Sequence, residues 1–246
     1  MISAAAQRAE MERIREPELM EEPLQARAYA EADFRSSDAA FLACVRQRLQ
    51  AWGGPAVERR PLRIVDLGCG PGNLSFPIAE ALPAATLLAL DGAAPMLRLA
   101  RDRRALEPRR WPSLRFELAR LPLAPGALGT LPQAFQPPYQ LLVSNSVLHH
   151  LHDPGVFWAA IRELAAPGAL LVLRDLRRPL NPTALRALVR RHAARAPAVL
   201  RRDFAHSLRA AFRPEEVVRQ LQAAGLPPLQ VAAAGDRYLD VWGSLA

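Results

Sequence analysis

The residues of this chain that can do chemistry follow apolar runs, and the first group joins an acid to alternating glycines. Residues 62–72 read L-R-I-V-D-L-G-C-G-P-G. The apolar run is typical of a buried parallel strand, with Asp66 at its carboxyl end. Gly68, Gly70 and Gly72 let the backbone take positive φ and approach a ligand without Cβ atoms in the way. A carboxylate here repels pyrophosphate but attracts ammonium or sulfonium, so the segment predicts a site for a cationic nucleotide-like ligand.

A second acid follows the next apolar run, residues 86–90, at a spacing that suits ribose binding. Asp91 lies 19 positions after Gly72, close to the roughly 20 residues at which an acid on the second strand meets a ribose. A carboxylate accepts two hydroxyl hydrogen bonds with charge assistance. The dinucleotide fingerprint, aligned on Gly68 and Gly70, requires a small residue where this chain has Asn73. A nicotinamide enzyme is therefore the least favoured interpretation.

The third group is a loop rich in histidine. Residues 144–154 read S-N-S-V-L-H-H-L-H-D-P after a predicted strand at 139–143. Ligands of open α/β sheets lie beyond the carboxyl ends of the strands, so we expect Asn145, Ser146 and His149 at the reacting group. His149 is a candidate general base, and a histidine that completes a turn is the alternative. The histidine spacing does not match a zinc site, and we predict no metal.

These motifs together resemble those of the class I S-adenosylmethionine-dependent methyltransferases. D-L-G-C-G-P-G resembles the family's nucleotide motif, and the segment from Asp91 to Met96 and the V-L-H-H-L run resemble later family segments. The resemblance covers roughly residues 61–246. One departure is the absence of the acid that the family often places before a Leu-Pro pair, where this chain has Arg120. Backbone groups of Arg120 and Leu121 are therefore expected to recognise adenine.

The resemblance implies a division of labour among the site residues. We expect Asp66 and the glycines to hold the methionine part of the cofactor, Asp91 the ribose, and Met96 with Leu121 the adenine. The predicted cofactor-binding residues are Asp66, Gly68, Gly70, Gly72, Asn73, Asp91, Gly92, Met96, Arg120, Leu121, Asn145 and Ser146. The predicted catalytic residues are His149 and Asn145.

The apolar pattern predicts the elements that position these residues. Further strands are expected at 114–118, 169–173, 229–233 and 238–242, and a Pro-Gly turn precedes the second of them. Helices are expected from Asn73, at 95–106, after Asp153 and from Pro214, and one containing Phe41, capped by a residue of 36–38. The fold class is α/β: a Rossmann-like, seven-stranded, mostly parallel sheet with an antiparallel last strand and helices on both faces.

Two segments are expected to cover the site. Residues 1–60 form an N-terminal arm and helical cap, and residues 61–246 form the core, with a helical lid insertion at 177–213. The predicted substrate-binding residues are Tyr29 from the arm, and Arg202, Phe204 and His206 from the lid. The guanidinium group of an arginine can bind a carboxylate or a phosphate in a bidentate manner. The alternative for Tyr29 is an aromatic residue that anchors a helix to the core. The alternative for Arg202, Phe204 and His206 is a lid surface that faces solvent.

Composition limits the classes of protein to consider. The 246 residues are 50% apolar, carry a net charge of +8 and contain no lysine, which indicates a coding bias rather than a nucleic-acid signature. Nucleic-acid binding is thus not favoured. Cys44 and Cys69 form no disulfide framework, which fits the cytoplasm. No run is long enough for a membrane span, and Met11 is an alternative start that would leave residues 1–10 as a disordered extension.

The sequence therefore predicts an S-adenosylmethionine-dependent methyltransferase that moves a methyl group to a small-molecule acceptor by in-line displacement. The alternatives are a tRNA-modifying enzyme of the same fold and a non-catalytic cofactor-binding regulator. The acceptor, the atom that receives the methyl group and the oligomeric state are not determined.

Overall fold

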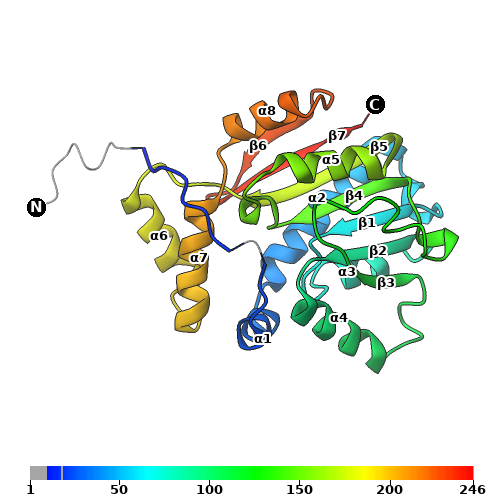
Figure 1. The fold of residues 1–246 in the computed structure, drawn as a ribbon, viewed down its shortest axis with the longest axis horizontal. Helices are drawn as coiled ribbons and strands as arrows, with labels where there is room; N and C mark the ends of the chain where they lie inside the picture. The colour runs from blue at the N-terminus through cyan, green and yellow to red at the C-terminus, as the bar shows by residue number, and fades with distance from the viewer. Residues whose placement is uncertain (1–9, 18, 246) are drawn as a thin grey trace, which may run out of the picture.

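One twisted sheet forms the centre of the protein in a computed structural model that describes residues 10–17 and 19–245 (Figure 1). Within those residues, seven strands pair in the order β3-β2-β1-β4-β5-β7-β6. The strands are β1 (Arg63–Leu67), β2 (Thr86–Asp91), β3 (Leu114–Leu118), β4 (Tyr139–Asn145), β5 (Ala165–Leu176), β6 (Gln230–Ala234) and β7 (Tyr238–Ser244). Strands β1 to β5 pair in parallel, and β7 is antiparallel to both of its neighbours. The predicted fold class is confirmed.

The last strand of the chain, β7, is antiparallel as predicted; it lies between β5 and β6, so that β6 forms the edge. One detail of the predicted sheet is wrong. The expected Pro167-Gly168 turn belongs to β5, where the pairing with β4 shifts register between Tyr139 and Leu141. Gly168 takes a φ of 72°, which lets the strand bend and continue where a turn was expected.

Helices cover both faces of the sheet because each strand buries side chains on both sides. On one face α2 (Arg35–Gly53), α3 (Ser75–Ala81) and α4 (Ala94–Leu106) pack through Phe41, Ile78 and Leu97. On the other face α5 (Gly155–Leu164) and α8 (Pro214–Ala223) pack through Phe157 and Val217. Short 3₁₀ turns η1 (Val57–Arg59), η2 (Gln133–Phe135) and η3 (Leu148–His150) lie in the connections. Burial on both faces explains the unbroken apolar runs in the sequence.

A smaller group of helices stands beyond the carboxyl ends of the parallel strands. It contains α1 (Pro23–Glu31), α6 (Pro182–Ala193) and α7 (Ala198–Ala210), and the N-terminal arm runs beside α7 (Figure 1). The arm is fixed by backbone hydrogen bonds from Met11 N to Leu180 O, 3.0 Å, and from Ile14 N to Arg209 O, 3.1 Å. The arm and the lid helices thus close over one end of the sheet.

One prediction about the N-terminal region is wrong, and another concerns residues that the structure does not describe. Residue 34 is the N-cap of α2, so no side chain of residues 36–38 caps that helix. The hypothesised extension at 1–10 lies, apart from Glu10, outside the described residues. The division of the chain at residue 60 stays a prediction. No described helix combines the length and the apolarity that crossing a bilayer requires.

Candidate active site

The acid at the end of β1 is buried beneath the glycine turn. Asp66 is 1% exposed, and Ser75 Oγ donates a 2.6 Å hydrogen bond to its Oδ2. Burial raises the pKa of Asp66 to about 7; the charge of Asp91 adds to this rise and the Ser75 hydrogen bond opposes it. A carboxyl group that is half ionised at neutral pH therefore lies under the turn, where a cationic group of a ligand would stabilise its charge.

The three glycines of the turn have different roles, although all take positive φ. A Cβ on Gly68 would lie 2.1 Å from Val147 Cγ2, and one on Gly72 would lie 2.6 Å from a Phe76 ring carbon. No described atom lies within 4 Å of the same position on Gly70. Gly70 therefore opens onto the cavity, whereas Gly68 and Gly72 permit close packing behind it.

Asp91 connects the two turns that border the cavity. Its Oδ2 accepts a 2.7 Å hydrogen bond from the Gly70 backbone N–H, and its Oδ1 accepts one of 2.7 Å from Ala93 N–H. Burial raises the pKa of Asp91, and these backbone hydrogen bonds oppose the rise. Each oxygen retains a second lone pair, which a ligand hydroxyl can use.

The arm covers the Asp91 end of the cavity. Met96 is 5% exposed and packs with Ala26 and Tyr29 of α1. The Arg120 guanidinium donates to Gly92 O at 3.3 Å and to Glu21 Oε1 at 2.7 Å. The Arg120 side chain thus ties the loop after β3 to the arm, and only its backbone is left to face a ligand.

The histidine loop presents one ring that is buried and held by an acid. Nδ1 of His149 contacts Asp175 Oδ1 at the end of β5, and the other Asp175 oxygen accepts from the backbone N–H groups of Val147 and His149. Burial lowers the pKa of His149, but Asp175 and Glu16 together raise it above its ordinary value. The hydrogen bond to Asp175 directs Nε2 of the ring away from β5, toward the arm.

Glu16 of the arm meets both histidines. Its Oε1 lies 3.5 Å from His149 Nε2 and 3.2 Å from His150 Nδ1. Burial raises the pKa of Glu16, and burial together with the charge of His149 lowers the pKa of His150 well below its ordinary value. A segment far away in the sequence therefore completes this end of the site.

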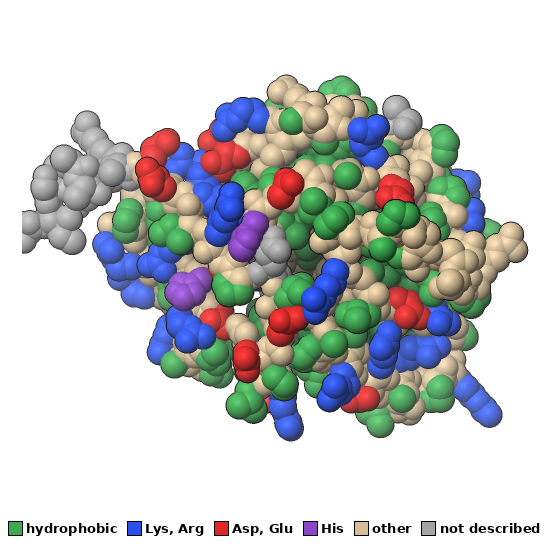
Figure 2. Space-filling model, in the orientation of Figure 1, with side chains coloured by type: hydrophobic (Ala, Val, Ile, Leu, Met, Phe, Trp, Pro, Cys, Tyr) green, Lys and Arg blue, Asp and Glu red, His purple; other side chains and the backbone are tan. Residues whose placement is uncertain are grey.

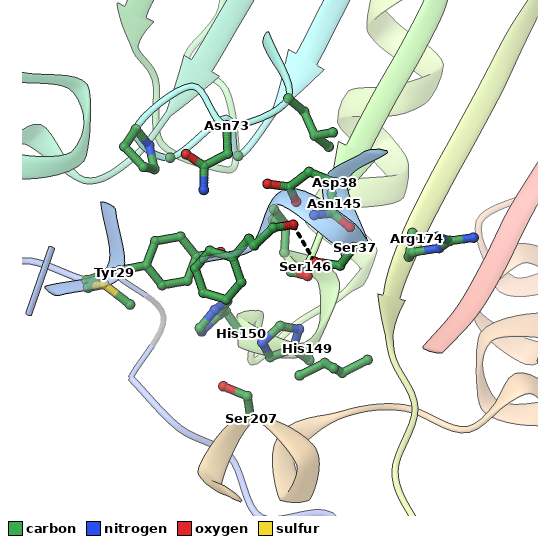
Figure 3. A pocket seen from close by; sticks show the side chains of 18 of the residues that line it. Tyr29, Ser37, Asp38, Asn73, Asn145, Ser146, His149, His150, Arg174 and Ser207 are labelled. Atoms are coloured by element: carbon green, nitrogen blue, oxygen red, sulfur yellow. Dashed lines mark hydrogen bonds between the residues drawn. The ribbon is translucent and has the colours of Figure 1, made fainter. Parts of the chain in front are cut away.

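One cavity of about 1310 Å³ at the carboxyl ends of the strands is lined by Asp66, Gly70, Asp91, His149 and His150, among others. Figure 3 shows Asn145 and Ser146 on one side of the histidines and Ser207 of α7 on the other, with Tyr29 beside them. Most of the predicted site residues contribute to the lining, including Tyr29 and Phe204. Gly72, Arg202 and His206 lie outside the lining; Arg202 pairs with Asp203, and His206 is exposed.

Several lining or supporting residues escaped the sequence-based prediction. Ser37 and Asp38, expected as helix caps, face the cavity from the first turn of α2 (Figure 3), and burial raises the pKa of Asp38 to about 6. Arg174 also lines the cavity and forms a bidentate pair with Asp240, 2.7 Å at both contacts. Asp175 could have been predicted as a site residue, because it is an acid at the end of an apolar strand, as are Asp66 and Asp91. No comparable sequence pattern marks Glu16.

A mostly parallel sheet with a glycine turn after β1 and an acid at the end of β2, both facing one cavity, is typical of Rossmann-like folds that bind nucleosides. A family model described as a methyltransferase domain matches residues 65–171. The match covers less than half of the chain, and over residues 65–171 the chain is similar to that family of methyltransferase domains.

Two known methyltransferases are similar to part of this chain. Malonyl-[acyl-carrier protein] O-methyltransferase of Legionella pneumophila is 32% identical over 116 residues, which is 47% of this chain and 37% of that protein. Trans-aconitate 2-methyltransferase of Methylobacterium nodulans is 37% identical over 113 residues, which is 46% of this chain and 38% of that protein. Both matches thus span less than half of the relative.

A solved structure extends the likeness of the fold to nearly the whole chain. A SAM dependent methyltransferase from Aquifex aeolicus has a TM-score of 0.62 at 15% identity, covering 91% of this chain and 98% of that one. The arrangement of the sheet and of its covering helices is therefore shared where the sequences have diverged.

Proposed function

We propose that this protein transfers the methyl group of S-adenosylmethionine to a small-molecule acceptor by in-line displacement. The observation that carries the proposal is the convergence of Asp66, Asp91 and His149 on one cavity from three different strand ends. Sites for a single drug-sized ligand occupy about 300–1,000 Å³, so a cavity of about 1310 Å³ has room for a cofactor and an acceptor together.

The proposed cofactor position follows the charges of the lining. The ammonium group of the methionine part lies near Asp66 and the open face of Gly70, and the ribose hydroxyls lie at Asp91. Adenine then extends toward Met96 and Leu121, under the part of the arm that Arg120 holds through Glu21. This orientation brings the sulfonium toward Asn145 and Ser146.

The acceptor then occupies the end of the cavity between His149 and the lid. Displacement at a sulfonium requires a nucleophile held about 3 Å from the methyl carbon, in a site that excludes water. The arm and α7 supply the enclosure, and Asp175 fixes the orientation of the His149 ring. Nε2 of His149 is positioned to take a proton from the acceptor, while Tyr29 and Phe204 provide apolar walls.

A small-molecule acceptor is favoured over nucleic acid by the enclosure and by the surface charge. Arginine and acidic side chains are interspersed over the face seen in Figure 2, without a continuous basic stripe. The acceptors that the names of the two relatives give, malonyl-[acyl-carrier protein] and trans-aconitate, are not nucleic acids. We also propose a cytoplasmic location, because Cys44 and Cys69 are both free thiols.

The proposal is tested by calorimetric titration with S-adenosylmethionine, followed by incubation with methyl-labelled cofactor and a metabolite extract. We expect saturable binding and label in a small product. Asp91→Ala should abolish both, and Asp102→Ala, which changes an exposed acid on α4, should change neither. Absence of cofactor binding would contradict the proposal, and label found in RNA would favour the tRNA-modifying alternative.

A further inference from the structure

Three acceptor atoms from distant parts of the chain converge at the acceptor end of the cavity. They are Glu16 Oε1, His149 Nε2 and His150 Nδ1, all within 4.8 Å of one another. Among the described residues, Glu16 Oε1 and His150 Nδ1 are buried atoms without a hydrogen-bond partner. Buried polar atoms are rarely left unpaired, because losing water without gaining a partner costs about 1–3 kcal/mol.

Each of the three side chains has its other polar atom fixed by a partner. His149 Nδ1 is held by Asp175. The backbone of Pro17, which can only accept, hydrogen-bonds the His150 ring, and the unpartnered Nδ1 leaves Nε2 as the donor. Glu16 Oε2 accepts from Ser207 Oγ at 3.3 Å. Ligating histidines are normally held by such partners through the second ring nitrogen.

Glu16 Oε1 and His150 Nδ1 therefore face each other as two acceptors 3.2 Å apart, and Nε2 of neutral His149 adds a third lone pair 3.5 Å from Glu16 Oε1. Two facing acceptors repel, whereas a cation placed between them is attracted to both. Glu16 and Asp175 contribute two negative charges, and Arg13, which donates to His149 O at 3.0 Å, is the neighbouring positive charge. The site thus combines a net negative charge with converging nitrogen and oxygen ligand atoms of the types that bind transition metals.

The distances also suit a metal ion. A tetrahedral ion with ligand atoms about 2.1 Å away keeps those atoms about 3.4 Å apart. Glu16 Oε1 lies 3.5 Å from His149 Nε2 and 3.2 Å from His150 Nδ1. The two histidines line the cavity (Figure 3), so an ion held by three ligands on one side keeps a coordination position open toward an acceptor.

We propose that Glu16, His149 and His150 form a two-histidine, one-carboxylate site for a divalent transition metal such as Zn²⁺, and that the open position takes an anionic oxygen of the acceptor. The acceptor part of this inference rests on the proposed function, but the metal site does not. Histidine spacing alone predicts no metal here, because the third ligand comes from the arm. A metal on His149 Nε2 would occupy the lone pair that the role of base requires, so the open position would suit an acceptor oxygen that is already ionised, such as that of a carboxylate.

Calorimetric titration of the chelator-treated full chain with ZnCl₂, and with MgCl₂ in parallel, tests the site without any activity assay. We expect about one Zn²⁺ per chain and no binding of Mg²⁺, which prefers oxygen ligands. Glu16→Gln and His150→Ala should each weaken Zn²⁺ binding at least tenfold. Asp175→Asn should weaken it about 10- to 100-fold through the orientation of His149.

The matched control is His206→Ala, which removes an exposed histidine of α7 and should leave the affinity unchanged. Circular dichroism melting of each variant checks the fold, and because Glu16 and His150 lie on different segments, loss of the arm alone cannot produce both results. Absence of Zn²⁺ binding, or equal affinity in all variants, would overturn the metal site. Cofactor titration of the same samples separates this failure from failure of the proposed function.

Discussion

Replacing Asp66 by asparagine tests whether a buried, partly protonated carboxyl group lies under the glycine turn. The side chain is 1% exposed, and its pKa rises from 3.8 to about 7 in the folded protein. At 1.36 kcal/mol for each pKa unit, the native state disfavours the ionised form by about 4 kcal/mol. Asparagine keeps an oxygen for the Ser75 hydrogen bond but carries no charge.

The direction in which stability changes with pH follows from the raised pKa of Asp66. The native protein holds the Asp66 proton more tightly than the unfolded chain, so stability falls as the pH rises from 3.8 through 7, and the full penalty applies above 7. Asp66→Asn should therefore raise the free energy of unfolding of the ligand-free protein by about 4 kcal/mol at pH 8 and by about 2 kcal/mol at pH 5.

Urea denaturation at both pH values, with linear extrapolation, measures this difference. Asp33→Asn is the matched control, because that side chain is 63% exposed and pairs with Arg35; we expect no gain in stability. If the effect of Asp66→Asn is the same at pH 5 and pH 8, the burial argument for Asp66 is wrong.

The same carboxyl group links cofactor binding to protons. If the ammonium group of the cofactor requires ionised Asp66, wild-type affinity should fall roughly tenfold for each pH unit below 7. Calorimetry in buffers of different ionisation enthalpy should then detect proton release on binding. Affinity that stays constant from pH 5 to pH 8 would remove Asp66 from the cofactor site.

Three further substitutions test other parts of the site. Asp91→Ala should eliminate cofactor binding with the fold intact, so unchanged binding in calorimetry would rule out the ribose assignment. His149→Ala should lower the initial rate of methyl transfer at least tenfold, and a smaller loss would argue against a general base. Gly68→Ala should destabilise the protein by about 2–4 kcal/mol in urea denaturation, because its Cβ would lie 2.1 Å from Val147 Cγ2 at a φ of 73°. Adding Val147→Ala should restore part of that loss, and no restoration would show that the contact is not responsible.

The fold could be predicted from the sequence to a large extent because its signals are local. The strand Leu114–Leu118 matches the predicted range, and the strand Thr86–Asp91 extends it by one residue. Strands that are buried on both faces give unbroken apolar runs, and positive φ values require glycine at the turn. The internal position of β7 could not be predicted, because strand order depends on pairing between distant segments.

The residues of the site also fall into two groups, those with a local sequence signal and those that only distant contacts bring together. The sequence by itself determined the positions of Asp66 at the end of β1, of the glycine turn, of Asp91 and of the histidine loop, since each of these lies within a short segment that must adopt one backbone path. Only the tertiary structure decided what surrounds them. Arg13 reaches the carbonyl of His149 across 136 positions of sequence, and the same arm brings Glu16 to the two histidines. Such contacts form because the arm packs against α7, and burial and charge at the packed surface then set the pKa values and leave the acceptor atoms facing one another.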